Sequence, residues 1–402
     1  MNRVAGGRVP YRILSIAPTS FFADYGCHVR ILEEVRALQR LGHQVTLCTY
    51  HSGNSVPGIR TVRMPRLPWQ RSVRVGSHWH KLYFDLFLAV TALVTAIRHR
   101  VDVVHAHLHE GALIGAVVAK LLRCPLVFDY QGSLSREMLD HRFLSARSPL
   151  LHLFARLERW INGLADVVIT SSEQARAQLA ATGVSERTLF ALADTVDPDI
   201  FRPKPKDDPA VADIHAALGI PAGRDIVVFL GLLADYQGIP QLLHAAVQVV
   251  RHRPSTHFLI MGYPGLEQYR RTAHDLQLLD HVTFTGRVPY DRAALHLSLG
   301  DVAVAPKLSE TEGNGKILNY MAMGLATVAF DTAVARELLG PHGVYAPPGN
   351  PFALADRIEE LLADPPRRRE LGALLRQRAC DEFSWHDGGR RLEALYAALL
   401  SG

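Results

Sequence analysis

The sequence predicts an α/β protein made of two Rossmann-like domains, each built around a parallel sheet. Strand-like runs alternate with helix-like runs along the chain, and the loops between them are short. A Pro-rich, charged stretch, "RPKPKDDPAVAD", interrupts this alternation, which then restarts. Because strand, helix and strand joined by short loops form right-handed parallel units, we expect a first domain over 1–201, a linker over 202–212, a second domain over 213–383 and a last helix over 384–402.

The individual elements follow from the length and period of the apolar runs. Short β-branched runs predict buried strands, and longer runs with apolar residues three or four apart predict helices. In the first domain, the expected strands are "RILSIAP", "HQVTLCTY", "VDVVHAHL", "CPLVFDYQG" and "ADVVITSS", with helices "CHVRILEEVRALQRLG", "GALIGAVVAKLLR" and "EQARAQLAATG" between them. In the second domain they are "DIVVFLGLL", "THFLIMG", "VTFTG", "DVAVAPK" and "ATVAF", separated by "IPQLLHAAVQVVRHR", "EQYRRTAHDLQLL", "DRAALHLSLG" and "KILNYMAMG".

One further segment, "LYFDLFLAVTALVTAI" at 82–97, is apolar nearly all round. It falls short of the ~20 residues that a membrane-spanning helix needs. Two interpretations remain: a helix of the domain core, or a helix that lies against a membrane surface.

Composition narrows the class of protein. The 402 residues include 44 basic and 39 acidic side chains, for a formal net charge of +5, and 48% are hydrophobic. A small, scattered basic excess is compatible with anionic substrates or an anionic membrane, whereas nucleic-acid binding requires a concentrated basic face. The four cysteines form no CxxC pair and the N-terminus has no signal-like apolar core, so we expect a cytoplasmic protein with reduced thiols.

The loops after the strands are where a parallel α/β sheet binds ligands. In "SETEGNGKILNYMAMG", Gly313, Asn314 and Gly315 allow backbone N–H groups to turn toward an anion at a helix start, and Lys316 adds a full charge there. Glu312 could accept hydrogen bonds from sugar hydroxyls. The alternative is an ordinary Glu–Gly loop with a surface lysine.

Two other glycine turns have the same strand–loop–helix setting. "GLLADYQG" runs from Gly231 to Gly238, and Gly26 in "DYGCHV" comes just before a helix. A phosphate approached by Gly26 from one domain and Gly315 from the other would lie in a cleft between the domains. Each turn by itself is a weak signal, because turns need glycine for geometry alone.

The first domain offers polar side chains at two strand ends. In "HAHLHEG", we expect His105 to be buried and His107 and Glu110 to reach the ligand cleft; three alternating histidines also permit a metal, but no fourth ligand is evident. In "DYQGSLS", Asp129 and Gln131 are either functional or turn and capping residues.

Taken in order along the chain, these loops resemble the retaining glycosyltransferases of family 4, which have the GT-B fold of two Rossmann-like domains facing across a cleft. The motifs that carry the resemblance are "HV…LGHQVTL", "DVVHAHL", "ADVVITSSE", "DTVDPDIFRP", "VVFLGLLADYQGIPQLLHA", "VTFTGRVP", "EGNGKILNYMAMGLATVAF" and "VYAPPGNPFALADRIEELLADP". It covers nearly the whole chain.

The resemblance implies a nucleotide-diphosphate sugar on the second domain, an acceptor on the first, transfer with retention, no metal or other cofactor, and a last helix that crosses back to the first domain. The residues carried over as catalytic are Glu312, Lys316, Gln131 and His107. Those carried over as donor-binding are Gly26, Gly231, Gln237, Gly313, Asn314, Gly315 and Asn319, and those on the acceptor side are Asp129, Glu110 and Tyr25.

The chain departs from the family at the diphosphate. The family usually has an Arg and a Lys where this sequence has Leu232 and Gln237, and a second Glu where Asn319 aligns. Many relatives have a His at the position of Gln131. A charge-assisted hydrogen bond contributes ~1.5–3 kcal/mol, so we expect another cation to replace the missing pair, and Lys316 is the best placed.

The sequence therefore predicts a hexosyltransferase that uses a UDP- or GDP-sugar and a polysaccharide, lipid-linked or small-molecule acceptor. A sugar-nucleotide-binding protein that has lost catalysis is the alternative, and a sugar-nucleotide epimerase is a third. The basic, Trp-containing stretch from Arg63 to Lys81, just before the apolar segment, predicts peripheral contact with the inner membrane face; a solvated loop is the alternative.

Overall fold

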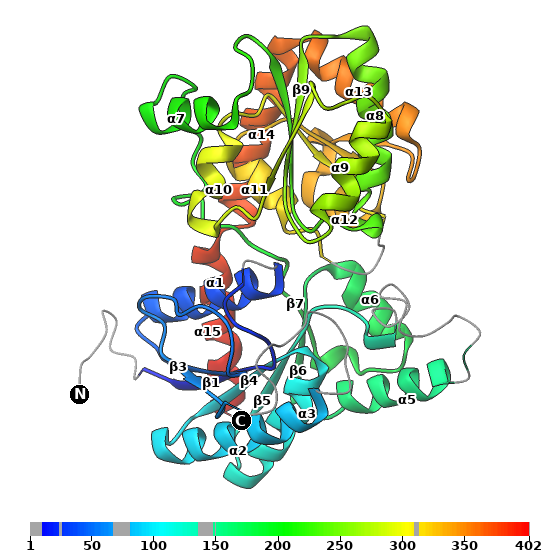
Figure 1. Ribbon diagram of the computed structural model, residues 1–402. Coiled ribbons are helices and arrows are strands. Elements are labelled where there is room, and N and C mark those ends of the chain that lie inside the picture. The colour runs from blue at the N-terminus through cyan, green and yellow to red at the C-terminus, as the bar shows by residue number, and fades with distance from the viewer. Residues whose placement is uncertain are drawn as a thin grey trace. The chain divides into compact units, whose positions relative to one another are not determined.

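The computed structural model describes residues 10–23, 26–66, 81–135, 148, 150–308 and 313–401. The chain forms two compact units (Figure 1). The first comprises Met1–Ala193, Thr311–Gly313 and Trp385–Gly402, and the second Asp194–Glu310 and Asn314–Ser384. The division falls after Ala193, earlier than the predicted residue 201.

The first unit contains a seven-stranded sheet, ordered β3-β2-β1-β4-β5-β6-β7, in which every described pair of neighbours is parallel. Its strands are β1 (Arg12–Ala17), β2 (Gln44–Thr49), β3 (Thr61–Arg63), β4 (Val103–His107), β5 (Leu126–Tyr130), β6 (Val167–Thr170) and β7 (Leu189–Ala191). Its helices are α1 (Gly26–Arg40), α2 (Lys81–His99), α3 (Leu108–Leu122), α5 (Leu150–Asn162), α6 (Glu173–Ala181), α15 (Trp385–Ser401) and the 3₁₀ turn η1 (Glu186–Thr188).

The two faces of this sheet differ because successive side chains along a strand point to opposite faces. Leu14 and Ile16 of β1 pack into a core with Phe84 and Leu88 of α2. Ser15, between them, points to the other face, where it meets His107 of β4. Accordingly α2, α3 and α5 cover one face of the sheet, while α1 and α15 lie on the other (Figure 1).

The last helix packs on α1, as the predicted return to the first domain requires. Leu392 and Tyr396 of α15 are buried. A Cβ on Gly389 would lie 3.0 Å from the Cβ of Ala37, so the missing side chain lets the two helices approach closely.

The second unit repeats the architecture with a six-stranded parallel sheet, ordered β10-β9-β8-β11-β12-β13. Its strands are β8 (Asp225–Leu230), β9 (Thr256–Met261), β10 (Val282–Gly286), β11 (Val302–Ala305), β12 (Thr327–Phe330) and β13 (Val344–Ala346). Its helices are α7 (Pro209–Leu218), α8 (Ile239–His252), α9 (Leu266–Asp275), α10 (Tyr290–Leu297), α11 (Lys316–Ala322), α12 (Ala333–Leu339), α13 (Pro351–Ala363) and α14 (Pro365–Glu382), with 3₁₀ turns η2 (Asp235–Gln237) and η3 (Gly340–His342).

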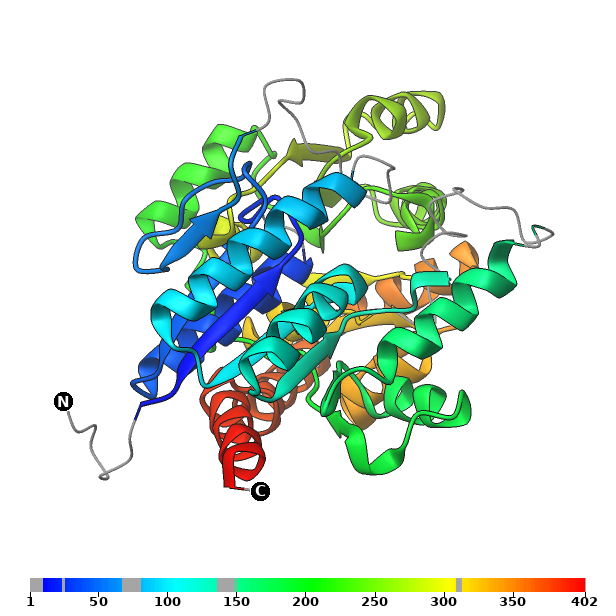
Figure 2. The ribbon, with the colours of Figure 1, turned by 90° about the horizontal axis from the view of Figure 1, so that it is seen from below.

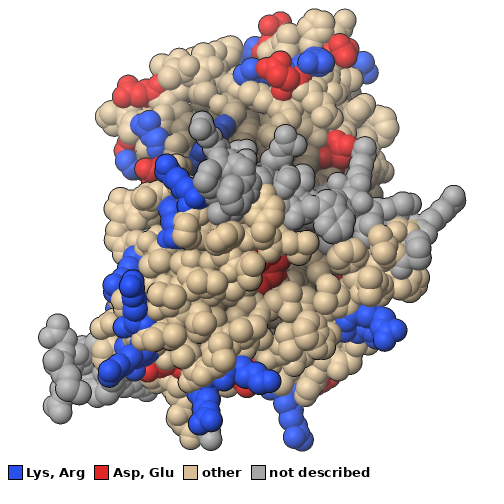
Figure 3. Space-filling view, turned by 60° about the horizontal axis from the view of Figure 1, so that its bottom comes forward, with Lys and Arg blue, Asp and Glu red and all other residues tan. Residues whose placement is uncertain are grey.

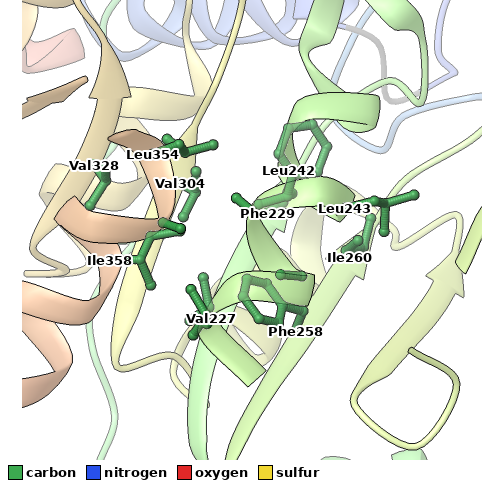
Figure 4. Packing of buried hydrophobic residues seen from close by; sticks show 14 of the residues in the cluster. Val227, Phe229, Leu242, Leu243, Phe258, Ile260, Val304, Val328, Leu354 and Ile358 are labelled. Atoms are coloured by element: carbon green, nitrogen blue, oxygen red, sulfur yellow. The ribbon is translucent and has the colours of Figure 1, made fainter. Parts of the chain in front are cut away.

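The core of the second unit lies between this sheet and helices α8 and α13. Val227 and Phe229 of β8 pack against Phe258 and Ile260 of β9, with Leu242 and Leu243 of α8 and Leu354 and Ile358 of α13 closing the cluster (Figure 4). These strands are buried on both sides, which is why they appear in the sequence as nearly continuous apolar runs.

The predicted linker is partly wrong. Residues 209–212 belong to helix α7, because Asp208 caps it, accepting a hydrogen bond from the Ala210 N–H at 2.9 Å, and Pro209 suits the first helical position. The Pro-rich composition that suggested a linker is here the start signal of a helix.

Candidate functional site

The carboxyl ends of β8 and β11 form the switch point of the second sheet. These strands are neighbours, but the chain continues from β8 to β9 on one side and from β11 to β12 on the other. Loops that leave in opposite directions open a crevice in which α/β sheets bind ligands. Both loops that the sequence analysis selected in this unit, the one after β8 and the one after β11, begin here.

The glycines of the loop after β8 are required by close contacts. Gly238 has φ +77°, and a Cβ there would lie 1.9 Å from the carbonyl oxygen of Pro306. Gly231 has φ +152°, and a Cβ there would lie 2.9 Å from Cε of Lys316. The first glycine therefore lets the two loops touch, and the second leaves room for the lysine side chain.

Lys316 begins α11 and reaches back over the end of β8. Its ammonium donates a hydrogen bond to Oε1 of the buried Gln237 and lies 4.6 Å from the centre of the Phe229 ring. Tyr320, one turn later, accepts a 2.7 Å hydrogen bond from the Leu230 N–H and so holds α11 against β8. These contacts fix a positive charge beside Gly231 at the switch point.

Asn314 offers an acceptor close to this lysine in the chain. Its side chain is buried, and Oδ1 accepts no hydrogen bond from the described residues. Leaving a buried carbonyl oxygen unbonded costs about 1–3 kcal/mol, so this atom is suited to a donor group of a ligand. Gly315 is the residue before α11, and Asn319 is half-buried on it.

The segment after β11 also contains Lys307, which the sequence analysis did not select. Its neighbours on both sides contact the loop after β8: Leu308 N–H donates to the Tyr236 carbonyl at 2.9 Å, and Pro306 meets Gly238. Lys307 is buried. A lysine two residues after a buried strand was a visible signal, since that is where ligand-binding side chains are placed.

Four predicted site residues need separate mention. Glu312 and Tyr25 lie outside the described residues, so their roles stay predictions. Gly313 is half-buried. Gly26 begins α1, and a Cβ there would meet nothing within 4 Å, so packing among the described residues does not explain a glycine at this position.

In the first unit, Asp129 at the end of β5 is the centre of a buried polar network. Arg30 of α1 binds both carboxylate oxygens, with contacts of 2.9–3.1 Å. His107 Nδ1 lies 3.1 Å from Oδ2, and the Gln131 amide donates to the same oxygen at 2.7 Å. Burial alone would raise the pKa of Asp129, but Arg30 and His107 outweigh it, and the pKa lies well below its ordinary value.

This network orients Gln131. A carboxylate can only accept hydrogen bonds, so the amide nitrogen of Gln131 must face Asp129 and the amide oxygen must face away. That oxygen is buried and accepts no hydrogen bond from the described residues. Asp129 therefore acts as a positioning residue that presents Oε1 of Gln131 as an acceptor.

The histidines differ from expectation in one respect. His105 is buried, as predicted, and its Nδ1 lies 2.6 Å from the Tyr396 hydroxyl. His107 is also buried, with 1% of its surface exposed, so the expectation that it reaches the ligand cleft is wrong. The reason is that both its ring nitrogens are used inside the domain: Nδ1 on Asp129 and Nε2 on Ser15 at 3.0 Å. Glu110 is half-buried.

The absence of a fourth metal ligand beside these histidines, expected from the sequence, is not found in the structure. Glu34, His105, His107 and Asp129 bring one potential ligand atom each within 4.8 Å of one another. However, Arg30 lies within the same cluster and pairs with Glu34 at 3.2 Å as well as with Asp129. Its guanidinium supplies the positive charge that a metal would bring, so the residues do not favour a metal.

Comparison with known proteins identifies the family of the chain. Residues 25–193 match the family described as glycosyl transferase 4-like domain, and residues 211–378 match glycosyl transferases group 1. A GDP-mannose-dependent alpha-(1-6)-phosphatidylinositol monomannoside mannosyltransferase of Mycolicibacterium smegmatis is 32% identical over 61% of this chain, which spans 64% of the mannosyltransferase. A 2-deoxystreptamine glucosyltransferase of Streptomyces kanamyceticus is 26% identical over 92% of this chain and 98% of its own length.

Solved structures share the fold. Sucrose-phosphate synthase from Thermosynechococcus elongatus superposes with a TM-score of 0.81 at 22% identity, covering 97% of this chain and 99% of that one. HepE from Anabaena in complex with UDP-glucose gives a TM-score of 0.78 at 17% identity, covering 96% and 100%. The predicted fold class is thereby confirmed, and the chain belongs to the group 1, family 4-like glycosyltransferases with the GT-B fold.

Proposed function

We propose that this protein transfers a hexosyl group from a UDP- or GDP-sugar to a polysaccharide, lipid-linked or small-molecule acceptor, with retention of anomeric configuration. The observation that carries the proposal is Lys316, held at the switch point of the second sheet by Gln237 and Phe229. A sugar-nucleotide donor leaves as a nucleoside diphosphate, and an ammonium fixed beside that leaving group stabilises the charge that develops on it.

We infer that Lys316 takes the place of the two cations that the family usually has at the donor diphosphate. Gln237, which stands where relatives usually have a lysine, accepts the hydrogen bond of Lys316. The same region of the site thus receives a positive charge from α11 instead of from the loop after β8. A glutamine at 237 and a lysine at 316 are compatible partners, whereas two lysines so close would repel each other.

The remaining donor contacts follow from the same two loops. We assign Oδ1 of Asn314 to a donor group of the nucleotide sugar, because the atom is buried and unbonded among the described residues. Glu312 is assigned to the sugar hydroxyls, Asn319 to the ribose, and Gly231, Gly313 and Gly315 to close backbone approach. In the first unit, Oε1 of Gln131 is assigned to the transferring sugar or the acceptor, with Asp129 and His107 as positioning residues.

The names of the relatives support a sugar nucleotide as the donor substrate, and they leave a GDP-sugar and a UDP-sugar to be compared. The mycobacterial relative uses GDP-mannose, and the HepE structure contains UDP-glucose. Their acceptors, where the names give them, include a phosphatidylinositol mannoside and 2-deoxystreptamine. Lipid-linked and small soluble acceptors therefore both belong in the test.

A panel of nucleotide sugars measured by thermal shift, followed by donor hydrolysis without acceptor, tests the proposal. We expect at least one UDP- or GDP-sugar to raise the melting temperature, because a ligand that binds only the folded state stabilises it. We also expect slow release of nucleoside diphosphate that chelator does not abolish, and, with an acceptor, an α-linked product from an α-linked donor. Binding without any hydrolysis or transfer would favour the non-catalytic alternative, and activity that requires added metal would contradict the metal-free proposal.

A further inference from the structure

Three helices of the first unit carry a continuous exposed apolar face. On α2, five large side chains spaced three or four residues apart are 44–67% exposed: Leu82, Leu86, Val90, Val94 and Ile97. The same spacing recurs on α5 with Leu150, Leu153, Leu157 and Trp160, and α3 between them adds Val117 and Leu121. We call these eleven residues the apolar helical face.

The three stripes lie side by side. Helix α3 packs against both α2 and α5, and the view from below shows the three helices in a row on one face of the sheet (Figure 2). Residues three or four apart fall on one side of a helix, so each helix turns one stripe away from the core. A face of this extent is unusual on a soluble domain and marks an interaction surface.

The charges around this face have one sign. Among the described side chains of the three helices, the exposed lysines and arginines are Arg98, Lys120, Arg156 and Arg159, and Arg100 and Arg123 follow α2 and α3 directly. The acids on these helices, Asp85, Glu110 and Glu158, are half-buried or buried. The space-filling view shows a broad tan surface with little red in it and blue side chains toward its edges (Figure 3).

We propose that the apolar helical face docks on the surface of an anionic lipid bilayer. Large apolar side chains enter the boundary between headgroups and acyl chains, basic side chains at the margin attract anionic headgroups, and an exposed Trp prefers that boundary. The inference goes beyond glycosyl transfer, and it assigns the contact to helices and not to the basic stretch from Arg63 to Lys81. Most of that stretch lies outside the described residues, and Arg63 itself donates to the Ser52 and Asn54 carbonyls.

Helix α2 lies on the bilayer in this proposal and does not cross it. In the part of the chain that the structure describes, one helix is long and apolar enough to span a membrane by length and composition alone. That helix is α2, over Leu82–His99. Its inward side chains Phe84, Leu88, Ala92 and Ala96 are fully buried in the core of the sheet. If α2 crossed a membrane, these four buried side chains would have to leave the domain core. Docking of the exposed side on a bilayer leaves them packed there.

A second copy of the chain is the competing occupant, and charge argues against it. A two-fold interface brings the same patch of both copies together. Both copies would then bring Arg98, Lys120, Arg156 and Arg159 into the contact, with no exposed acid on the described part of these helices to pair with them, and like charges at a contact repel. Anionic lipid complements the same charges, so the bilayer is the better match.

Flotation of the full chain with vesicles tests the proposal. We expect binding to phosphatidylcholine vesicles that contain phosphatidylglycerol, weaker binding to phosphatidylcholine alone, and release as salt rises. Replacing Arg98, Lys120, Arg156 and Arg159 with Gln should lower binding by at least tenfold, since each basic residue near anionic lipid contributes about fivefold. The matched control replaces four exposed arginines of the second unit, Arg251, Arg271, Arg367 and Arg369, with Gln and should bind nearly as well as the unaltered chain.

A second set of variants tests the contribution of the exposed apolar side chains to lipid binding. Leu86→Gln, Val90→Gln and Leu153→Gln together should abolish binding, whereas Leu279→Gln with Phe352→Gln, exposed apolar residues of the second unit, should leave it intact. Quenching of tryptophan fluorescence by brominated lipid should fall in Trp160→Phe. Undiminished quenching in that variant, equal binding to neutral and anionic vesicles, or no binding to either would overturn the proposal. So would a dimer in sedimentation velocity without lipid that the triple Gln variant abolishes.

Discussion

Gly231 is the residue whose substitution most directly probes the space that Lys316 occupies. A Cβ there would lie 2.9 Å from Cε and 3.0 Å from Nζ of Lys316, at φ +152°. Gly231→Ala should therefore displace the ammonium and weaken nucleoside-diphosphate binding by roughly tenfold, as expected when a charge-assisted contact is lost. Gly223→Ala is the control, because it has φ +76° but nothing within 4 Å of its Cβ. Both variants should also lose about 1–3 kcal/mol of stability, because a residue with a side chain is strained at these positive φ values. Equal loss of binding in both would argue against the contact.

The second prediction at the residue scale concerns Glu312 and the hydroxyl groups of the donor sugar. If its carboxylate holds sugar hydroxyls, Glu312→Ala should weaken binding of the nucleotide sugar by about tenfold and binding of the bare nucleotide very little. Calorimetry with both ligands measures this difference. Glu310→Ala, two residues earlier in the sequence, is the matched control. A similar loss for both ligands in Glu312→Ala would place this side chain away from the sugar.

At the scale of helices and strands, a buried ion pair joins α1 to β5 through Arg30 and Asp129. Arg30 contacts Asp129, Glu34 and the Leu192 carbonyl, and so ties α1 to the sheet and to the segment after β7. Arg30→Gln leaves two buried carboxylates without their cation and should cost about 3–5 kcal/mol of stability. Urea unfolding measures the loss. Arg176→Gln removes an exposed pair with Glu173 and should change stability little; comparable losses for both variants would refute a special role for the buried pair.

At this scale the sequence predicts most of the strands well, and it predicts the partners of side chains across the sheet poorly. Short apolar runs predict β8 and β11. Because these strands are parallel, the loops that follow them lie at the same edge of the sheet. Nothing local in "CHVRILEEVRALQ" indicates that Arg30 and Glu34 point at His105 and Asp129, residues far along the chain. For the same reason the sequence indicates that His107 lies at a strand end and not that Ser15 and Asp129 enclose it.

The apolar segment 82–97 illustrates the limit in another way. Its composition is compatible with a core helix and with a membrane-surface helix, and the structure contains features of both: Leu88 and Ala92 are buried in the core, while Leu86 and Val90 are exposed. The side chains of one helix divide between two environments only once the sheet and its neighbours α3 and α5 are in place. Periodicity was weak here because both sides of the helix are apolar.

At the scale of the whole molecule, the buried histidines make stability depend on pH. Burial, with the nearby His107, lowers the pKa of His105 to about 3, whereas an unfolded histidine titrates near ~6.5. Between these values the unfolded chain binds more protons, so stability is complete above pH ~6.5 and falls as the pH is lowered toward 3, by about 1.4 kcal/mol per pH unit for this histidine.

Urea unfolding at several pH values between 7 and 5 checks this slope. His105→Gln should reduce the slope by about 1.4 kcal/mol per pH unit, in addition to any loss of stability common to all pH values from its missing contact with Tyr396. His244→Gln, an exposed histidine of α8, is the matched control variant. An unaltered slope in His105→Gln would mean that this residue is not held neutral in the folded state.

The central claim is that Lys316 binds the diphosphate of a sugar nucleotide at the switch point of the second sheet, and calorimetry of Lys316→Ala with UDP and GDP tests it most directly. We predict that affinity for whichever nucleotide binds falls roughly ten- to hundredfold, since the lost charge-assisted hydrogen bond contributes about 1.5–3 kcal/mol. Lys204→Ala, an exposed lysine of the same unit, should bind like the unaltered chain. Unchanged nucleotide affinity in Lys316→Ala, with the fold intact, would contradict the account.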